Sequence, residues 1–105
     1  MNIVLIGYRC TGKSSIGELL SRRLKWGFVD TDELIEREAG LNIEDIVAKK
    51  GWDEFRRIEK EVVKKVSCFD SFVIATGGGV VLDPENVSRL QKNGWIIWLL
   101  SLIHI

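Results

Sequence analysis

The chain has 105 residues, of which 46% are hydrophobic and 29% charged, a composition typical of one globular domain and not of a disordered segment. Its 15 basic and 15 acidic residues give a formal net charge of zero, which argues against a nucleic-acid-binding surface. No apolar run reaches the roughly 18 residues of a membrane helix, and the 2 cysteines do not indicate a disulfide scaffold, so we expect a cytoplasmic protein without membrane or nucleic-acid partners.

A phosphate-binding motif stands near the start of the chain. The apolar run 3–6 predicts a buried parallel strand; the pattern G-x-x-x-x-G-K-S follows at 7–14, and a helical pattern continues over 13–24. Strand, loop and helix in this order place backbone N–H groups around a phosphate at a helix N-terminus. The predicted ATP contacts are Gly7, Cys10, Thr11, Gly12, Lys13, Ser14 and Ser15.

Two side chains of this loop have predicted chemical roles. Lys13 is expected to reach the β- and γ-phosphates as a catalytic cation, and the Ser14 hydroxyl to hold Mg²⁺. Cys10 is interpreted as a small tolerated residue, with an oxidation-sensitive thiol as the alternative. The other cysteine, Cys68, is expected to be partly buried and unreactive. A chance glycine-rich turn is the competing interpretation of the motif, and the flanking strand and helix disfavour it.

The rest of the chain alternates short strands with helices. Beyond the first strand and helix, we expect strands over 28–30, 72–75 and 95–100 and helices over 31–39, 42–50, 52–66 and 84–93. Alternation of this kind predicts an α/β domain with a parallel sheet. In such a sheet, ligands bind beyond the carboxyl ends of the strands.

A pair of carboxylates follows the second strand. Asp30 and Asp32 stand two residues apart, so one can orient an Mg²⁺ shell while the other accepts a proton from a substrate hydroxyl. The alternative is structural: Thr31 or Asp32 caps the next helix, and Glu33 favours its dipole. The residues alone do not decide between the two.

An arginine and a glutamate share the next motif, F-R-R-I-E at 55–59. In the functional interpretation, Arg56 binds a substrate carboxylate in bidentate fashion while Glu59 holds its guanidinium. The alternative is an exposed ion pair on a helix surface, worth about 0.3–0.5 kcal/mol, and the residues alone favour it. Phe55 is expected in the core and Arg57 in solvent.

Three consecutive glycines, Gly77, Gly78 and Gly79, follow the third strand. Such a run weakens a fold unless some group must approach the backbone closely. Its exposed N–H groups can bind a substrate oxygen or a phosphate. A flexible turn is the alternative interpretation.

Four motifs in this order and spacing resemble the shikimate kinase family: the phosphate-binding loop, D-T-D at 30–32, G-x-x-x-F-R-x-x-E at 51–59 and G-G-G-V at 77–80. The resemblance covers residues 1–99. It implies a three-layer α/β/α P-loop domain with a parallel sheet in the order 2-3-1-4. It also implies transfer of the ATP γ-phosphoryl group to the 3-hydroxyl of shikimate with Mg²⁺, a step of aromatic amino acid biosynthesis.

The resemblance assigns a role to each motif. It makes Asp32 the contact of the substrate hydroxyls and the proposed base. It places Asp30 toward the metal, together with Ser14. It makes Arg56 the ligand of the shikimate carboxylate, with Phe55 and Glu59 as structural support for Arg56. The glycine triplet, chiefly Gly78, backs the substrate. Another small-metabolite kinase, such as a gluconate kinase, and a non-catalytic nucleotide-binding module stay open as alternatives.

Some family features fall outside this sequence. The fifth strand, the lid with its phosphate-facing arginine, a second substrate-binding arginine and the adenine-contacting loop would lie beyond residue 105. We therefore expect the 105-residue chain to have little or no activity and the full-length parent to be a monomeric kinase. Residues 100–105 match the translation of a sequencing-library adapter and are interpreted as a non-native tail, with a natural strand end as the alternative.

Overall fold

The computed structural model describes residues 1–7, 13–77 and 79–99. Within these residues, four strands and four α-helices follow one another, with a short 3₁₀ helix before the last α-helix. They are β1 (Asn2–Gly7), α1 (Lys13–Leu24), β2 (Gly27–Asp30), α2 (Thr31–Ala39), α3 (Ile43–Val66), β3 (Phe72–Ala75), η1 (Val80–Leu82), α4 (Pro84–Lys92) and β4 (Gly94–Leu99).

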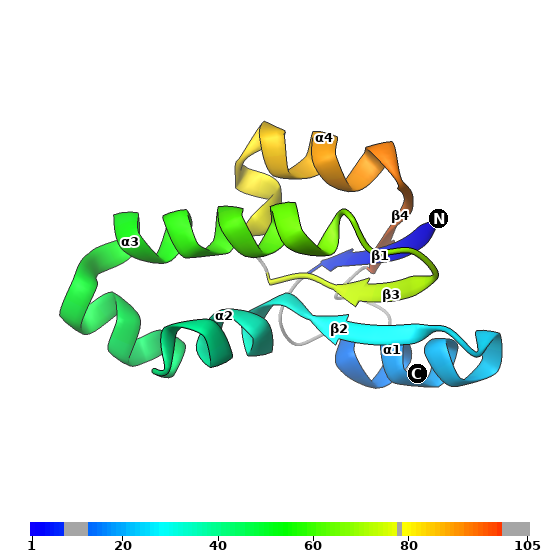
Figure 1. The fold of residues 1–105 in the computed structure, drawn as a ribbon, viewed down its shortest axis with the longest axis horizontal. Helices are drawn as coiled ribbons and strands as arrows, with labels where there is room; N and C mark the ends of the chain where they lie inside the picture. Colours follow the sequence, from blue (N-terminus) through cyan, green and yellow to red (C-terminus); the bar gives the residue numbers. More distant parts are fainter. Residues whose placement is uncertain (8–12, 78, 100–105) are drawn as a thin grey trace.

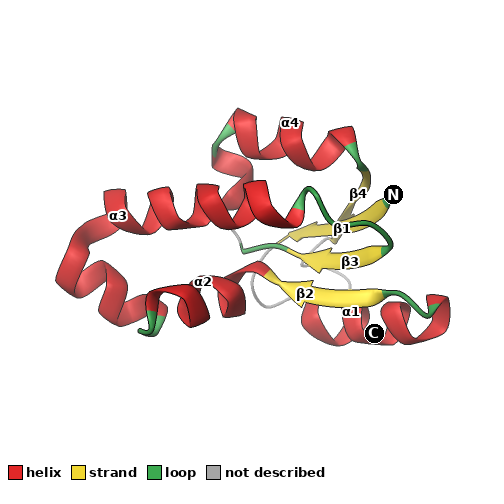
Figure 2. Ribbon diagram, viewed as in Figure 1, coloured by secondary structure: helices red, strands yellow, loops and turns green. Residues whose placement is uncertain are grey.

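The four strands form one parallel sheet in the order β2-β3-β1-β4, which confirms the predicted order. Helix α1 covers one face, and α3 and α4 lie on the other, so the domain has three layers (Figure 1). The arrowheads of β1, β2 and β3 point to the same edge (Figure 2). This is the edge at which a parallel sheet binds its ligands.

The main core lies between the sheet and helices α3 and α4. Val4 of β1 and Ile74 of β3 are neighbours in the sheet and fully buried. They belong to one apolar cluster with Val62 and Val66 of α3 and Leu90 of α4. Burial on this scale, at about 1.5–3 kcal/mol for each large side chain, holds the two layers together.

The ends of the helices follow the expected local signals. Gly40 ends α2 in the left-handed conformation at φ 70°, which glycine adopts without steric cost. Asn42 caps α3 by accepting a hydrogen bond from the Asp45 N–H at 2.8 Å. Asp83 caps α4, with Pro84 at its first position, where a missing N–H costs nothing.

Helix α3 is interrupted at Gly51, whose φ of 87° and ψ of 168° are not helical. The sequence places a helix end at this glycine and a new helix from Trp52, and both features are present. Figure 1 shows the resulting bend, from which the second half of α3 runs back toward the sheet. The Arg56 motif therefore stands on the segment that approaches the strand ends.

Several apolar side chains of the described chain are exposed. On α1 these are Ile16, Leu19 and Leu24. Strand β4 pairs only with β1 among the described strands, and its Trp95 and Trp98 are 68% and 62% exposed. Among the described strands, β4 therefore presents an uncovered apolar edge. Among the described helices, none is long and apolar enough to cross a bilayer.

Cys68 is exposed, so the prediction that it is partly buried was wrong. It stands in the turn after α3. The inward position there belongs to Phe69, whose ring packs 4.7 Å from that of Phe72.

Candidate functional site

The sheet brings two of the predicted motifs side by side. Asp30, the last residue of β2, pairs in register with Ala75, the last residue of β3. The D-T-D segment and the glycine run therefore leave neighbouring strands at the same edge. The two motifs are far apart in the sequence, and the pairing of β2 with β3 brings them together.

Asp30 is the cap of α2. Its Oδ1 accepts from the N–H groups of Asp32 at 2.9 Å and Glu33 at 3.4 Å. The alternative that Thr31 or Asp32 caps this helix was wrong, because Asp30 has the extended conformation of a cap and Thr31 is already helical. Capping therefore does not account for the carboxylate of Asp32.

The hydroxyl of Thr31 connects the two motifs. Its Oγ1 accepts a buried hydrogen bond of 3.0 Å from the N–H of Gly77. Sequence reasoning considered Thr31 only as a cap and missed this role. The signal was weak, because the partner lies 46 residues away in sequence.

The glycine run is flanked by the two predicted substrate ligands. A Cβ atom at Gly77 would lie 2.3 Å from Oδ1 of Asp32, and one at Gly79 would lie 2.0 Å from Nη1 of Arg56. Both distances are far below van der Waals contact, so any side chain at these positions displaces the charged groups. The close approach predicted for this backbone is made by the chain's own Asp32 and Arg56. Gly78 lies outside the described residues.

Arg56 and Glu59 form an ion pair with one buried partner. Nη1 of Arg56 donates to Oε1 of Glu59 at 2.9 Å, and the two side chains are 39% and 3% exposed. A fully exposed surface pair, the alternative from the sequence, does not describe this geometry. Burial raises the pKa of the Glu59 carboxyl. The hydrogen bond from Arg56 offsets part of this rise, and the negative charges of Asp32 and Asp83 add to it. Arg57 points into solvent, as expected, and pairs with Glu54.

Two aromatic rings lie against the guanidinium of Arg56. Its Cζ is 5.4 Å from the ring centroid of Trp52 and 5.2 Å from that of Phe55. Phe55 is buried, as predicted. Trp52 was not predicted as a site residue, although its position four residues before Arg56 places it on the same helix face.

A cavity of about 320 Å³ opens beside this cluster. Arg56, Glu59 and Gly79 line it. The segment from the end of η1 to the start of α4 also contributes to the lining, with Leu82, Asp83, Pro84 and Asn86. Acidic, basic and backbone groups therefore meet at one hollow near the carboxyl end of β3.

The phosphate-binding loop is described only at its two ends. Strand β1 ends at Gly7 and α1 begins at Lys13, which confirms the strand and helix on either side of the motif. Ser15 is exposed in the first turn of α1. Cys10, Thr11 and Gly12 lie outside the described residues, as do the side chains of Lys13 and Ser14 and the suspected tail 100–105.

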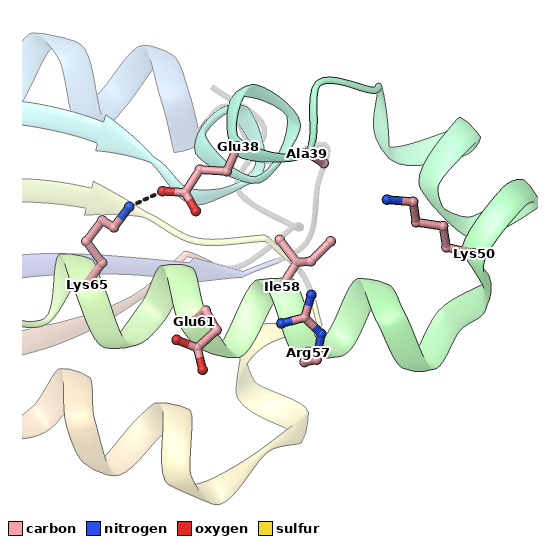
Figure 3. Close-up of a pocket in the computed structure, with 7 residues that line it drawn as sticks. All are labelled: Glu38, Ala39, Lys50, Arg57, Ile58, Glu61 and Lys65. Carbon is pink, nitrogen blue, oxygen red and sulfur yellow. Dashed lines mark hydrogen bonds and ion pairs between the residues drawn. The ribbon is translucent and has the colours of Figure 1, made fainter.

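A second hollow, of about 430 Å³, lies between α2 and α3, away from the predicted site residues. Figure 3 shows an ion pair between Lys65 and Glu38 at one end and the Lys50 side chain reaching in from the other. Its lining mixes positive and negative groups on solvent-facing helices. This hollow does not contain any of the residues predicted for nucleotide or acceptor.

The fold and the arrangement at the strand ends define a class of protein. A parallel sheet in the order β2-β3-β1-β4, a phosphate-binding motif between β1 and α1, and charged groups at the carboxyl ends of β2 and β3 are those of a P-loop kinase domain. A family model described as shikimate kinase matches residues 9–104, and the chain belongs to this family.

Individual relatives agree with this assignment. The shikimate kinase of Symbiobacterium thermophilum is 50% identical over 99 residues, which are 94% of this chain and 57% of that protein. The crystal structure of shikimate kinase from Aquifex aeolicus matches with a TM-score of 0.89 at 42% identity, over 93% of this chain and 58% of that one. The structure of shikimate kinase from Acinetobacter baumannii in complex with shikimate matches with a TM-score of 0.91 at 35% identity, over 93% of this chain and 55% of that one.

The chain spans about half the length of the relatives it matches. A gluconokinase from Sinorhizobium meliloti matches with a TM-score of 0.53 at 15% identity, over 92% of this chain and 55% of that one. At that identity the likeness concerns the fold alone.

Proposed function

We propose that the protein containing this chain transfers the γ-phosphoryl group of ATP to the 3-hydroxyl of shikimate. The main support is the convergence of Asp32 and Arg56 on the glycine backbone after β3, where Cβ atoms at Gly77 and Gly79 would fall 2.3 and 2.0 Å from their side chains. A carboxylate and a guanidinium beside a bare strand end suit a small acid that carries several hydroxyls.

Asp32 is the proposed base. The proton of the acceptor hydroxyl passes to its carboxylate as the hydroxyl oxygen attacks the γ-phosphorus and ADP leaves. The cap provided by Asp30 and the Thr31–Gly77 hydrogen bond support this assignment, because they fix the backbone on both sides of the carboxylate.

Arg56 is the proposed ligand of the shikimate carboxylate. Glu59 fixes Nη1 of its guanidinium from the buried side, and Gly79 leaves room for the guanidinium against the backbone. This contact exists in the ground state and the transition state alike, because the carboxylate does not react. Its loss should therefore raise KM more than it lowers kcat.

On the nucleotide side, Lys13 is proposed to contact the β- and γ-phosphates. The other proposed contacts of ATP are Gly7, Cys10, Thr11, Gly12, Ser14 and Ser15. Ser14 and Asp30 are the proposed protein ligands of Mg²⁺, whose charge neutralises the phosphates when it is bound. The donor types fit this ion, because Mg²⁺ prefers hydroxyl and carboxylate oxygens and takes only one or two from the protein when phosphates complete its shell. Asp30 stands at the end of β2 with its Oδ1 fixed by two N–H groups.

Two substitutions and a matched control test the assignments in the complete product of the gene. With shikimate and ATP, Asp32→Asn should lower kcat by about 10²- to 10⁴-fold. Arg56→Lys should raise KM for shikimate by about 10- to 100-fold with little change in kcat. Arg57→Lys is the control, because Arg57 is exposed and paired with Glu54, and both constants should stay at wild-type values.

Wild-type turnover that does not require shikimate, or full turnover of the Asp32→Asn variant, would contradict the proposal. Phosphorylation of a different sugar acid would favour the gluconate kinase alternative, and ATP binding without transfer would favour a nucleotide-binding module. For the 105-residue chain alone we propose little or no activity. A monomeric state and a cytoplasmic location of the complete protein stay predictions.

A further inference from the structure

Trp52 occupies a position that burial does not explain. Its side chain is 59% exposed, although it begins the segment of α3 that follows the break at Gly51. The guanidinium Cζ of Arg56 lies 5.4 Å from its ring centroid, within the about 6 Å over which a cation and an aromatic face attract each other. Core packing therefore does not account for this ring, whose described contacts include the charged group of Arg56.

Trp52 and three other residues constrain the guanidinium of Arg56. Glu59 accepts from Nη1 at 2.9 Å, and the ring of Phe55 lies 5.2 Å from Cζ. The backbone of Gly79 runs so close that an added Cβ would lie 2.0 Å from Nη1. Glu59 and Phe55 are buried and Trp52 is exposed, so Trp52 is the aromatic contact on the solvent side.

The helix spacing makes these contacts a connected set. Trp52 and Arg56 are four residues apart, and Arg56 and Glu59 three apart, so all three lie along one face of the helix. The Trp52 ring also meets that of Phe55 edge to face, with centroids 5.8 Å apart and an interplanar angle of 89°. Phe55 thus supports the indole from the core side.

We propose that Trp52 is a positioning residue for the acceptor carboxylate. Its ring face holds the guanidinium of Arg56 on the side opposite the core, so that the N–H groups not used by Glu59 are directed to a carboxylate. A guanidinium with fewer available orientations loses less entropy when it binds a planar anion in bidentate fashion. The inference rests on the proposed function, because the carboxylate in question is that of shikimate.

Steady-state kinetics of the complete gene product with shikimate tests the role. Trp52→Leu removes the aromatic face and keeps an apolar side chain, and should raise KM for shikimate by about two- to fivefold with unchanged kcat. Trp52→Phe keeps an aromatic face and should restore most of the affinity. In an Arg56→Ala background, Trp52→Leu should have no further effect on KM, because a positioning residue acts only through the group that it positions.

A spectroscopic measurement provides a readout that does not depend on turnover. The Nε–Hε resonance of Arg56 should shift in Trp52→Leu and stay near its wild-type position in Trp52→Phe, because the ring current of an aromatic face is lost only in the first. Both variants should fold, since the indole is exposed.

The outcomes separate the inference from the proposed function. If the wild type turns over normally and Trp52→Leu has the wild-type KM for shikimate, the inference is overturned and the kinase assignment stands. The same holds if Trp52→Leu raises KM equally in the wild-type and Arg56→Ala backgrounds. An Arg56 resonance that does not respond to Trp52→Leu would do the same. Absence of shikimate turnover in the wild type would overturn the proposed function and this inference with it.

Discussion

Thr31 and Gly77 are joined by a buried hydrogen bond of 3.0 Å, in which the glycine N–H donates to the threonine hydroxyl. Thr31 is fully buried. The bond ties the first turn of α2, which carries Asp32, to the glycine run after β3, against which Asp32 and Arg56 pack. The bond therefore directly connects the two sides of the candidate site.

Thr31→Val should separate the two sides. The valine has nearly the shape of threonine but no acceptor, so the buried N–H of Gly77 loses its partner. We expect a loss of about 1–3 kcal/mol in the free energy of unfolding, measured by urea denaturation of the chain. Thr31→Ser keeps the hydroxyl and is the control. A valine variant as stable as the wild type would contradict a role for the hydrogen bond.

Gly79→Ala should impair binding more than stability. The added methyl group would lie 2.0 Å from Nη1 of Arg56, which is the far end of a side chain 39% exposed and can turn toward solvent. The displaced guanidinium then no longer faces the acceptor. Titration calorimetry of the complete gene product with shikimate should show about tenfold weaker binding or worse, with a melting temperature close to that of the wild type. Unchanged affinity would show that Arg56 is not held by this backbone.

Gly51→Ala should destabilise the fold by about 1–3 kcal/mol, because φ of 87° with ψ of 168° is accessible essentially to glycine alone. Space is not the reason, since nothing lies within 4 Å of a Cβ built there. Lys50→Ala, one residue earlier on an exposed helical position, should change stability by less than about 0.5 kcal/mol. Equal effects of the two substitutions in thermal denaturation would refute the conformational argument.

Glu59 should make stability decrease with rising pH. Burial raises the pKa of its carboxyl above the ordinary 4.5, so between the two values the folded chain binds a proton that the unfolded chain has released. The contribution of this group is therefore fully present below pH 4.5 and is lost as pH rises through the raised pKa. Glu59→Gln removes the titration. The difference in unfolding free energy, wild type minus variant, should fall with pH, and a flat or rising difference would contradict the assignment.

The 105-residue chain should self-associate through β4. This strand pairs only with β1 among the described strands, and Trp95 and Trp98 are largely exposed. An open parallel edge with apolar side chains is a template for pairing with another chain. Replacing both tryptophans by lysine should shift the sedimentation profile toward monomer. A wild-type chain that already sediments as a monomer would refute this prediction.

Local signals in the sequence were sufficient for the strands and α-helices and their order along the chain, but not for the short 3₁₀ helix η1. Buried apolar runs, caps such as Asn42 and Asp83, and breaks at Gly40 and Gly51 act within a few residues, so they can be recognised without the fold. The strand order came from the family resemblance, since nothing local specifies which strand lies beside which.

The contacts within the site depended on the fold. That Thr31 bonds to Gly77, and that Glu59 is buried, follow from how β2, β3 and α3 come together. Cys68 was misplaced for the same reason, because its neighbour Phe69 took the inward position. The spacing of four residues predicts that Trp52 lies on the same helix face as Arg56. Nothing in the neighbouring sequence indicates that this tryptophan has a function.

Asp32 and Arg56 are proposed to hold shikimate for phosphorylation. The most direct test is a ³¹P NMR measurement of the complete gene product with ATP, Mg²⁺ and shikimate, and with Asp32→Asn as the paired sample. We expect a new phosphate monoester signal of shikimate 3-phosphate that grows in step with ADP and is nearly absent in the variant. ADP formation without a phosphorylated shikimate, or an equal ester signal in both samples, would contradict these roles of Asp32 and Arg56.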